Sequence, residues 1–224
     1  MKRLKCLVAI AAMTVGVVAT ADAQEINRST MARKMRQNQE ELRQYTWQTK
    51  MTFLVNDELR RSDTFTVRYV MGGMIEKMQI DSEVAKTKIR RPDGKKLSKK
   101  ELEAAKEFIV DVKNQLDGYL SPLFAEKAVA TAKVLKGDGT IILISQNVMN
   151  SGDSVEITLR EATHKPVSAK ITAALEGTPV ALDVTFGSID YGPNHPARSI
   201  TTSEWQGFKL SIITENSNYK SNPI

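Results

Sequence analysis

The sequence predicts an α+β fold, in which helices pack over one side of a curved antiparallel sheet. Three observations lead to this prediction: apolar and polar residues alternate in several segments, two other segments have helical spacing, and the links between the alternating segments are short. Short links favour antiparallel neighbours, because a parallel crossover needs about a dozen or more residues. The order of helix, three strands, helix and about five further strands suits one domain.

The first 23 residues have the three zones of an export signal. Basic residues stand at positions 2, 3 and 5, an apolar run extends from Leu7 to about Ala19, and Ala21-Asp22-Ala23 offers small side chains to a signal peptidase. The run is shorter than the about 20 apolar residues of a membrane helix. We therefore expect cleavage after Ala23, a periplasmic or secreted protein, and a single domain over residues 24–224.

The mature composition narrows the class of protein further. Removal of the signal leaves 29 basic and 25 acidic residues, a net charge of +4, which does not indicate a nucleic-acid partner. Cys6, the only cysteine, precedes the apolar run, so the mature chain has neither a disulfide nor a lipid-modified N-terminal cysteine. A chain of 201 residues suits one core, and we expect a monomer.

Two segments have the spacing of amphipathic helices. Residues 25–44 contain no Gly or Pro and carry one modest apolar stripe. Ser98-Lys99-Lys100-Glu101 is a capping-box pattern, in which the serine oxygen accepts from the Glu101 amide and the glutamate reaches back to the Ser98 amide. The helix that begins there has a wide apolar face and should end at Gly118.

The strands follow from alternation and from turn residues. Asn56-Asp57 predicts a turn, and Gly72-Gly73 suits the positive φ angles of a tight hairpin. The expected strands cover residues 45–55, 65–71, 74–80, 128–135, 140–148, 154–160, 167–175, 180–189 and 199–214.

This order of elements resembles the LolA/LolB family of periplasmic lipoprotein carriers. The resemblance rests on the first helix leading into the Tyr45-Thr46-Trp47 strand, and on Val155–Leu159 followed by His164-Lys165-Pro166 and the strand from Val167 to Ile171. Segments 194–198 and 216–219 also resemble secreted bacterial proteins placed beside that family. The resemblance implies an incomplete β-barrel with helices as a lid over an apolar cavity. It also implies an early-strand arginine that holds the lid, for which Arg60, Arg61 and Arg68 are candidates.

An apolar cavity would take its lining from the first three strands and from the second helix. Methionine and aromatic side chains suit variable acyl chains, although the same side chains also fill ordinary sheet cores, so both interpretations stay open. The candidate lining residues are Trp47, Met51, Phe53, Phe65, Tyr69, Met71, Met78, Phe108, Ile109 and Val112.

Eight cations fall within fifteen residues before the second helix. Such a cluster could attract anionic lipid headgroups or an acidic envelope protein, and it could equally be a solvated loop. The cluster consists of Lys86, Lys88, Arg90, Arg91, Lys95, Lys96, Lys99 and Lys100.

No motif indicates catalysis, a metal or a cofactor. His164 and His195 are the only histidines and lack the ligand spacing of a zinc site, so we expect both to be exposed turn residues. Asp183, Asp190 and Glu204 are expected to face solvent. The function expected is non-enzymatic binding of a lipid or a lipoprotein acyl chain. The alternatives are an envelope interaction or sensor module of the same fold without a cavity, and a hydrolase without a sequence motif.

Overall fold

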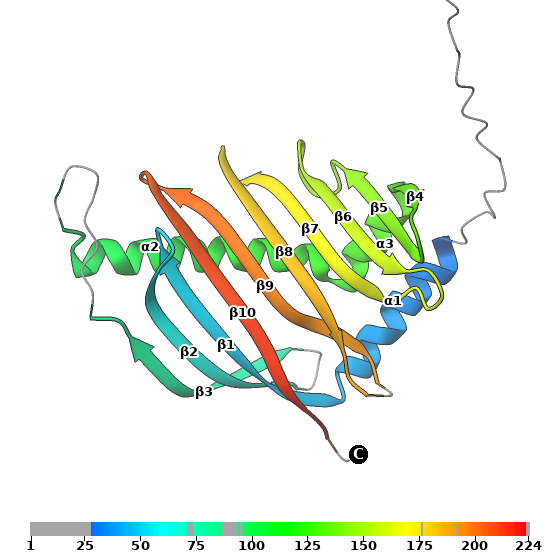
Figure 1. Cartoon of the computed structure of the whole chain (residues 1–224), viewed down its shortest axis with the longest axis horizontal. Helices are drawn as coiled ribbons and strands as arrows, with labels where there is room; N and C mark the ends of the chain where they lie inside the picture. The colour runs from blue at the N-terminus through cyan, green and yellow to red at the C-terminus, as the bar shows by residue number, and fades with distance from the viewer. Residues whose placement is uncertain are drawn as a thin grey trace, which may run out of the picture.

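One antiparallel sheet forms the framework of the molecule. The computed structural model describes residues 28–70, 74–86, 94, 96–175, 177–190 and 192–222. Ten strands follow each other in the order β3-β2-β1-β10-β9-β8-β7-β6-β5-β4, and every neighbouring pair is antiparallel. The sheet curves around the helices without closing, so that β3 and β4 are free edges (Figure 1). The expected α+β class and incomplete barrel are therefore confirmed.

The strands agree with the expected segments over most of the chain. β1 and β2 pair through the turn at Asn56-Asp57, where both residues have positive φ, as a two-residue hairpin loop requires. The predicted Gly72-Gly73 hairpin and the signal segment lie outside the described residues. The strands are β1 (Tyr45–Val55), β2 (Glu58–Tyr69), β3 (Ile75–Val84), β4 (Lys133–Lys136), β5 (Thr140–Gln146), β6 (Ser154–Arg160), β7 (Pro166–Leu175), β8 (Thr178–Ser188), β9 (Asn194–Trp205) and β10 (Phe208–Ser221).

All helices lie on one side of the sheet (Figure 1). Both amphipathic helices are confirmed, and Ser98 and Glu101 form the predicted capping box at the start of α2. α2 packs against β8, β9 and β10, while α1 packs against α3. None of the described helices is both long and apolar enough to cross a bilayer. The helical elements are α1 (Arg28–Leu42), α2 (Lys99–Asp117), the short 3₁₀ turn η2 (Gly118–Leu120) and α3 (Pro122–Thr131).

Two predicted strands are wrong. Residues 128–131 end helix α3, and only residues 133–136 form β4. Proline at the first turn of a helix is compatible with helical φ, and Phe124, Ala128 and Ala132 are buried at a spacing of four, which is a helical period. The segment 199–214 is a hairpin of β9 and β10, because Gln206 and Gly207 both adopt positive φ and reverse the chain.

The hydrophobic core fills the space between the sheet and the helices. α2 contributes Ile109, Val112 and Leu116 to this core. Strands supply alternate residues, as period-two burial requires, and helix α1 adds Met31. The largest fully buried side chains on the strands are Val55, Ile141, Leu143, Leu159, Ile171, Leu182, Phe208, Leu210 and Ile212.

Candidate functional site: a cavity between sheet and helices

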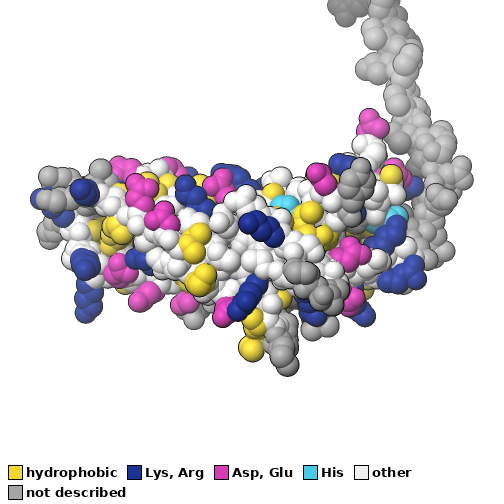
Figure 2. Space-filling model, turned by 90° about the horizontal axis from the view of Figure 1, so that it is seen from below, with side chains coloured by type: hydrophobic (Ala, Val, Ile, Leu, Met, Phe, Trp, Pro, Cys, Tyr) yellow, Lys and Arg dark blue, Asp and Glu magenta, His cyan; other side chains and the backbone are white. Residues whose placement is uncertain are grey.

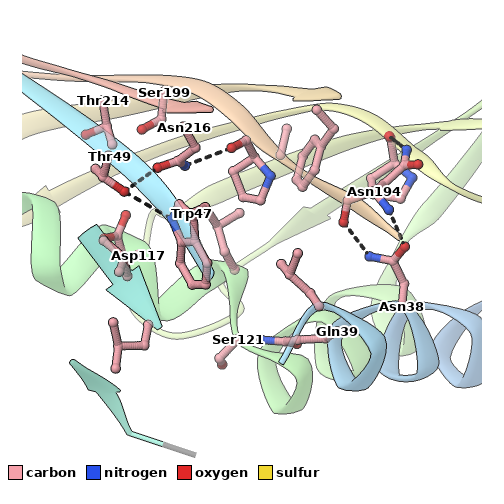
Figure 3. Close-up of a pocket in the computed structure, with 18 of the residues that line it drawn as sticks. Asn38, Gln39, Trp47, Thr49, Asp117, Ser121, Asn194, Ser199, Thr214 and Asn216 are labelled. Carbon is pink, nitrogen blue, oxygen red and sulfur yellow. Dashed lines mark hydrogen bonds between the residues drawn. The ribbon is translucent and has the colours of Figure 1, made fainter. Parts of the chain in front are cut away.

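A cavity of about 300 Å³ lies between the sheet and the helices (Figure 3). This volume is at the low end of the roughly 300–1,000 Å³ typical of small-molecule pockets. Helix α1 covers it with Met35, Asn38, Gln39 and Leu42. The last turns of α2 and the η2 segment close it with Lys113, Asp117, Tyr119, Leu120 and Ser121.

The sheet wall changes in character from one strand to the next. Near the free edge it consists of Ile75 and Lys77 of β3. The central strands β1, β10 and β9 add a group of hydroxyl and amide side chains beside Trp47. The far wall is apolar. The central polar residues are Thr49, Ser199, Thr214 and Asn216, and the far wall consists of Ile157, Pro166, Ala169 and Phe186.

A hydrogen-bonded chain orders the central wall (Figure 3). The indole nitrogen of Trp47 donates to Oγ1 of Thr49 at 3.0 Å, and Thr49 donates to Oδ1 of Asn216 at 2.6 Å. The amide of Asn216 donates in turn to the carbonyl of Pro196 at 2.8 Å. Because its only polar group is satisfied in this way, Trp47 presents an apolar ring to the cavity.

Aromatic rings extend this wall behind Trp47. Its ring lies 5.6 Å from that of Tyr69 and stacks on that of Tyr219 at 5.7 Å. Tyr219 in turn lies 4.0 Å from the ring of His195. Burial raises the pKa of both tyrosines, so their hydroxyls stay protonated at neutral pH.

A second polar contact ties helix α1 to the sheet. The side-chain amide of Asn38 accepts from the Asn194 backbone N–H at 2.7 Å and donates to the Asn194 carbonyl at 2.8 Å (Figure 3). The side chain of Asn194 donates to the carbonyl of Pro166 at 2.9 Å and accepts from Ser188. Asn38 therefore bonds to a strand backbone as a neighbouring strand would, and it fixes the helix over the cavity.

Three charged residues line the cavity, and they lie toward the β3 side. Lys113 and Asp117 form an ion pair one turn apart on α2. Lys77 reaches the same region from the exposed strand β3. Burial lowers the pKa of Lys77, the nearby Lys113 lowers it further, and Asp117 opposes both effects.

No protein-family model and no curated protein matches this sequence. Solved structures do resemble it over most of its length. A domain of an outer-membrane lipoprotein-sorting protein from Vibrio parahaemolyticus is 12% identical with a TM-score of 0.46, and the match covers 87% of this chain and 93% of that one. A LolA superfamily protein from Nitrosomonas europaea is 14% identical with a TM-score of 0.38, covering 86% and 94%. A chain of the Pseudomonas aeruginosa MucA/MucB complex is 8% identical with a TM-score of 0.25, covering 87% and 100%.

The architecture itself decides the fold. A curved antiparallel sheet stays open, and helices on one side close over a cavity, which is the arrangement that the sequence resemblance predicts. The sheet and the helices form the incomplete barrel that the sequence predicts. Identities of 8–14% carry no information about a ligand.

The cavity brings together three of the ten predicted lining residues, namely Trp47, Met51 and Tyr69. Phe53, Ile109 and Val112 belong to the buried core instead. Phe65 and Phe108 are partly buried and do not line the cavity, and Met71 lies outside the described residues.

Met78 is misplaced in the prediction because of strand register. It pairs with Thr66, whereas Ile75 and Lys77 pair with Tyr69 and Val67, so the odd-numbered residues of β3 share the face of the cavity wall. The side chain of Met78 is 62% exposed. The even-numbered position of Met78 thus places its side chain on the opposite face of β3.

The three candidate arginines of β2 do not line this cavity. Arg60 is buried and pairs with Glu58 on the same strand. Arg61 pairs with Asp63 at 2.7 Å, and Arg68 pairs with Glu76 of β3. Helix α1 is held over the cavity by Asn38 instead, an uncharged residue that no sequence pattern indicates.

The described part of the basic cluster lies away from the cavity. Lys86, Lys96, Lys99 and Lys100 are all exposed. Lys88, Arg90, Arg91 and Lys95 lie outside the described residues. A role of this cluster in binding a membrane or an acidic protein stays a prediction.

The prediction that both histidines are exposed is wrong for His195, which is only 7% exposed. His164 lies in the β6–β7 turn, where it is partly buried beside Lys34. The ring of His195 packs at a tilt against that of Tyr219, the residue that also stacks on Trp47. Asp183, Asp190 and Glu204 are exposed as expected. Within the described ranges, no three His, Cys, Asp or Glu side chains gather in a metal-binding arrangement.

Proposed function

We propose that this chain is a non-enzymatic periplasmic or secreted binding protein whose cavity takes up an apolar ligand, either a lipid or the acyl chain of a lipoprotein. The observation that carries the proposal is the cavity lining, in which Met35 and Leu42 of α1, Trp47 of β1, Ile157 of β6 and Phe186 of β8 converge from four elements. The predicted signal segment, residues 1–23, supports the location.

Sequestration would need no chemical step. Burial of apolar surface contributes about 25 cal/mol per Å², which favours transfer of an acyl chain out of water. Along most of its length α2 packs over the core, through Ala105, Ile109 and Leu116 among others, whereas α1 covers the cavity. Release would therefore require movement of α1 rather than displacement of the whole of α2. Ligand release is then governed by the α1 contacts with the sheet, above all those of Asn38.

Native mass spectrometry tests this proposal directly. The full chain is expressed in a bacterium, purified from the periplasm without detergent, and its bound lipid is extracted and identified. A mass corresponding to residues 24–224 plus one lipid is the expected result. An empty protein that also fails to bind a fluorescent fatty acid would refute the carrier function, and a retained N-terminal segment would refute the proposed cleavage.

A second candidate function is interaction with another envelope protein. The free edge strand β3 and the residue before it expose apolar side chains among charged ones, and Figure 2 shows such a mixed face of the molecule. These side chains are those of Met74, Ile75, Met78, Ile80 and Val84. Large exposed apolar side chains in one place are typical of contact surfaces.

Surface variants separate the two functions. Met78→Glu on β3, and Lys96→Glu with Lys99→Glu and Lys100→Glu before and within α2, leave the cavity lining unchanged. The binding-protein function predicts unchanged lipid content for both variants. Loss of a specific co-purified envelope protein, with no lipid in the parent chain, would favour the interaction function instead.

A further inference from the structure

The cavity wall is asymmetric in charge along the strand order. Lys77 of β3 and the Lys113–Asp117 pair of α2 stand on the side of the free edge. Phe186, Ala169 and Ile157 of β8, β7 and β6 line the other side. A molecule that fills the cavity therefore meets cations at one end and apolar side chains at the other.

The charges at the first end do not cancel. Lys113 and Asp117 neutralise each other, and Lys77 forms no ion pair with any carboxylate of the described residues. The lining thus has a net charge of about one positive unit beside an apolar space. Lys77 borders solvent as well as this apolar space, so an anionic ligand head can pair with it without displacing a protein carboxylate.

Hydroxyl groups stand between the charged and the apolar ends. Ser199 and Thr214 face each other across β9 and β10, are both buried, and both line the cavity. Oγ1 of Thr214 has no hydrogen-bond partner among the described residues. Buried hydroxyls without a partner are uncommon, so a water is expected there.

We propose that the ligand is a single-chain amphiphile with one negative charge, a fatty-acid carboxylate, whose head lies beside Lys77 and whose chain runs toward Phe186, Ala169 and Ile157. The cavity volume of about 300 Å³ favours one chain over two. This inference rests on the proposed lipid-binding function and names the class of lipid. A lysophospholipid with a phosphodiester head has the same single charge on one chain and is the other source of this chemistry.

Titration of the purified, delipidated protein with matched amphiphiles tests the inference. Dodecanoate, dodecanol and dodecylamine share one chain and differ in head charge, and the fluorescence of Trp47 in the cavity wall reports binding. A charge-assisted hydrogen bond predicts a Kd for dodecanoate about tenfold or more below that for dodecanol. Dodecylamine is expected to bind more weakly than both.

Two lysine variants test whether Lys77 causes the preference for dodecanoate over dodecanol. Lys77→Met keeps the length of the side chain and should remove the preference for dodecanoate over dodecanol. Lys50→Met, on the solvent-exposed face of β1, is the control and should keep the preference. Because Lys77 stands on an exposed strand, the variant is expected to fold, which circular dichroism verifies.

The outcomes distinguish this inference from the function on which it rests. Equal affinity of the parent chain for dodecanoate and dodecanol would overturn the anionic head while leaving lipid binding intact. Binding of neither would overturn both. Tighter binding of a dodecanoyl lysophospholipid than of dodecanoate, with the same dependence on Lys77, would support the single negative charge and identify the phosphodiester as its source.

Discussion

The hydroxyl of Tyr119 donates a 2.8 Å hydrogen bond to Oδ2 of the buried Asp153. Backbone N–H groups of Val148, Met149 and Asn150 donate to the same carboxylate at 2.7–2.8 Å. Burial raises the pKa of Asp153, but the combined hydrogen bonds outweigh it and hold that pKa below its usual value. Asp153 thereby joins η2 to the β5–β6 hairpin and holds Tyr119 in the wall of the cavity.

Replacement of this carboxylate should destabilise the whole domain. Asp153→Ala leaves three backbone donors and the Tyr119 hydroxyl without their acceptor, and we expect the free energy of unfolding to fall by about 3 kcal/mol. Tyr119→Phe removes one hydrogen bond and should cost about 1 kcal/mol. Urea denaturation measures both. The exposed Asp183→Ala on β8 is the control, and an equal effect there would contradict the role of Asp153.

Acidification should weaken the fold through His195. Burial lowers the pKa of this imidazole, more than its backbone contact at Pro196 raises it. The unfolded chain, with an ordinary pKa of about 6.5, therefore binds the proton first. Stability from the neutral ring is present above that pH and is lost as the pH falls through the lower folded-state pKa.

The variant His195→Gln isolates this contribution, because it cannot titrate. The fall in unfolding free energy between pH 7 and pH 5, measured by urea denaturation, should be smaller for this variant than for the parent chain. His164→Gln serves as the comparison. Burial and the nearby Lys34 lower the pKa of His164, Glu161 opposes both effects, and the residue is only partly buried. An unchanged pH dependence in His195→Gln would refute a buried neutral ring.

The sequence predicts those elements whose signals are local. Alternation over residues 45–55 and 154–160 marks strands because one face of each is buried against the helices. The capping box at Ser98 is a short-range contact and is found as predicted. The turn at residues 206–207 was not predicted, because the alternation of polar and apolar residues in β9 resumes in β10 and the whole segment has the pattern of one strand.

The cavity was less predictable because distant segments build it. Trp47 and Tyr69 follow from strand patterns, but Asn38 gains its role only when α1 meets β9, which lies 156 positions further along the chain. Lys77 likewise faces the cavity because of its register with Val67 across β2 and β3. Such pairings depend on the tertiary fold and cannot be predicted from the periodicity of the local sequence.

Filling the apolar end of the cavity should block the ligand. Ala169 of β7 is buried and lines the cavity, so Ala169→Leu places a larger side chain where the acyl chain would end. We expect fatty-acid affinity to fall about tenfold, at a stability cost of about 1–3 kcal/mol from overpacking. Ala174→Leu makes the same change at an exposed position of β7 and should preserve affinity. Equal affinity in both variants would place the ligand elsewhere.

Loss of the contact between Asn38 and Asn194 should speed ligand exchange. Asn38→Ala removes both hydrogen bonds that hold α1 against β9, and we expect a cost of about 1–2 kcal/mol. If α1 must move for release, that energy lowers the barrier, so stopped-flow dissociation of a fluorescent fatty acid should become several-fold faster. The neighbouring Gln37→Ala loses a contact only within α1, to Glu41, and should dissociate at the parent rate. Equal dissociation rates in the two variants would show that the ligand leaves without movement of α1, and would direct attention to the end of α2 as the moving part.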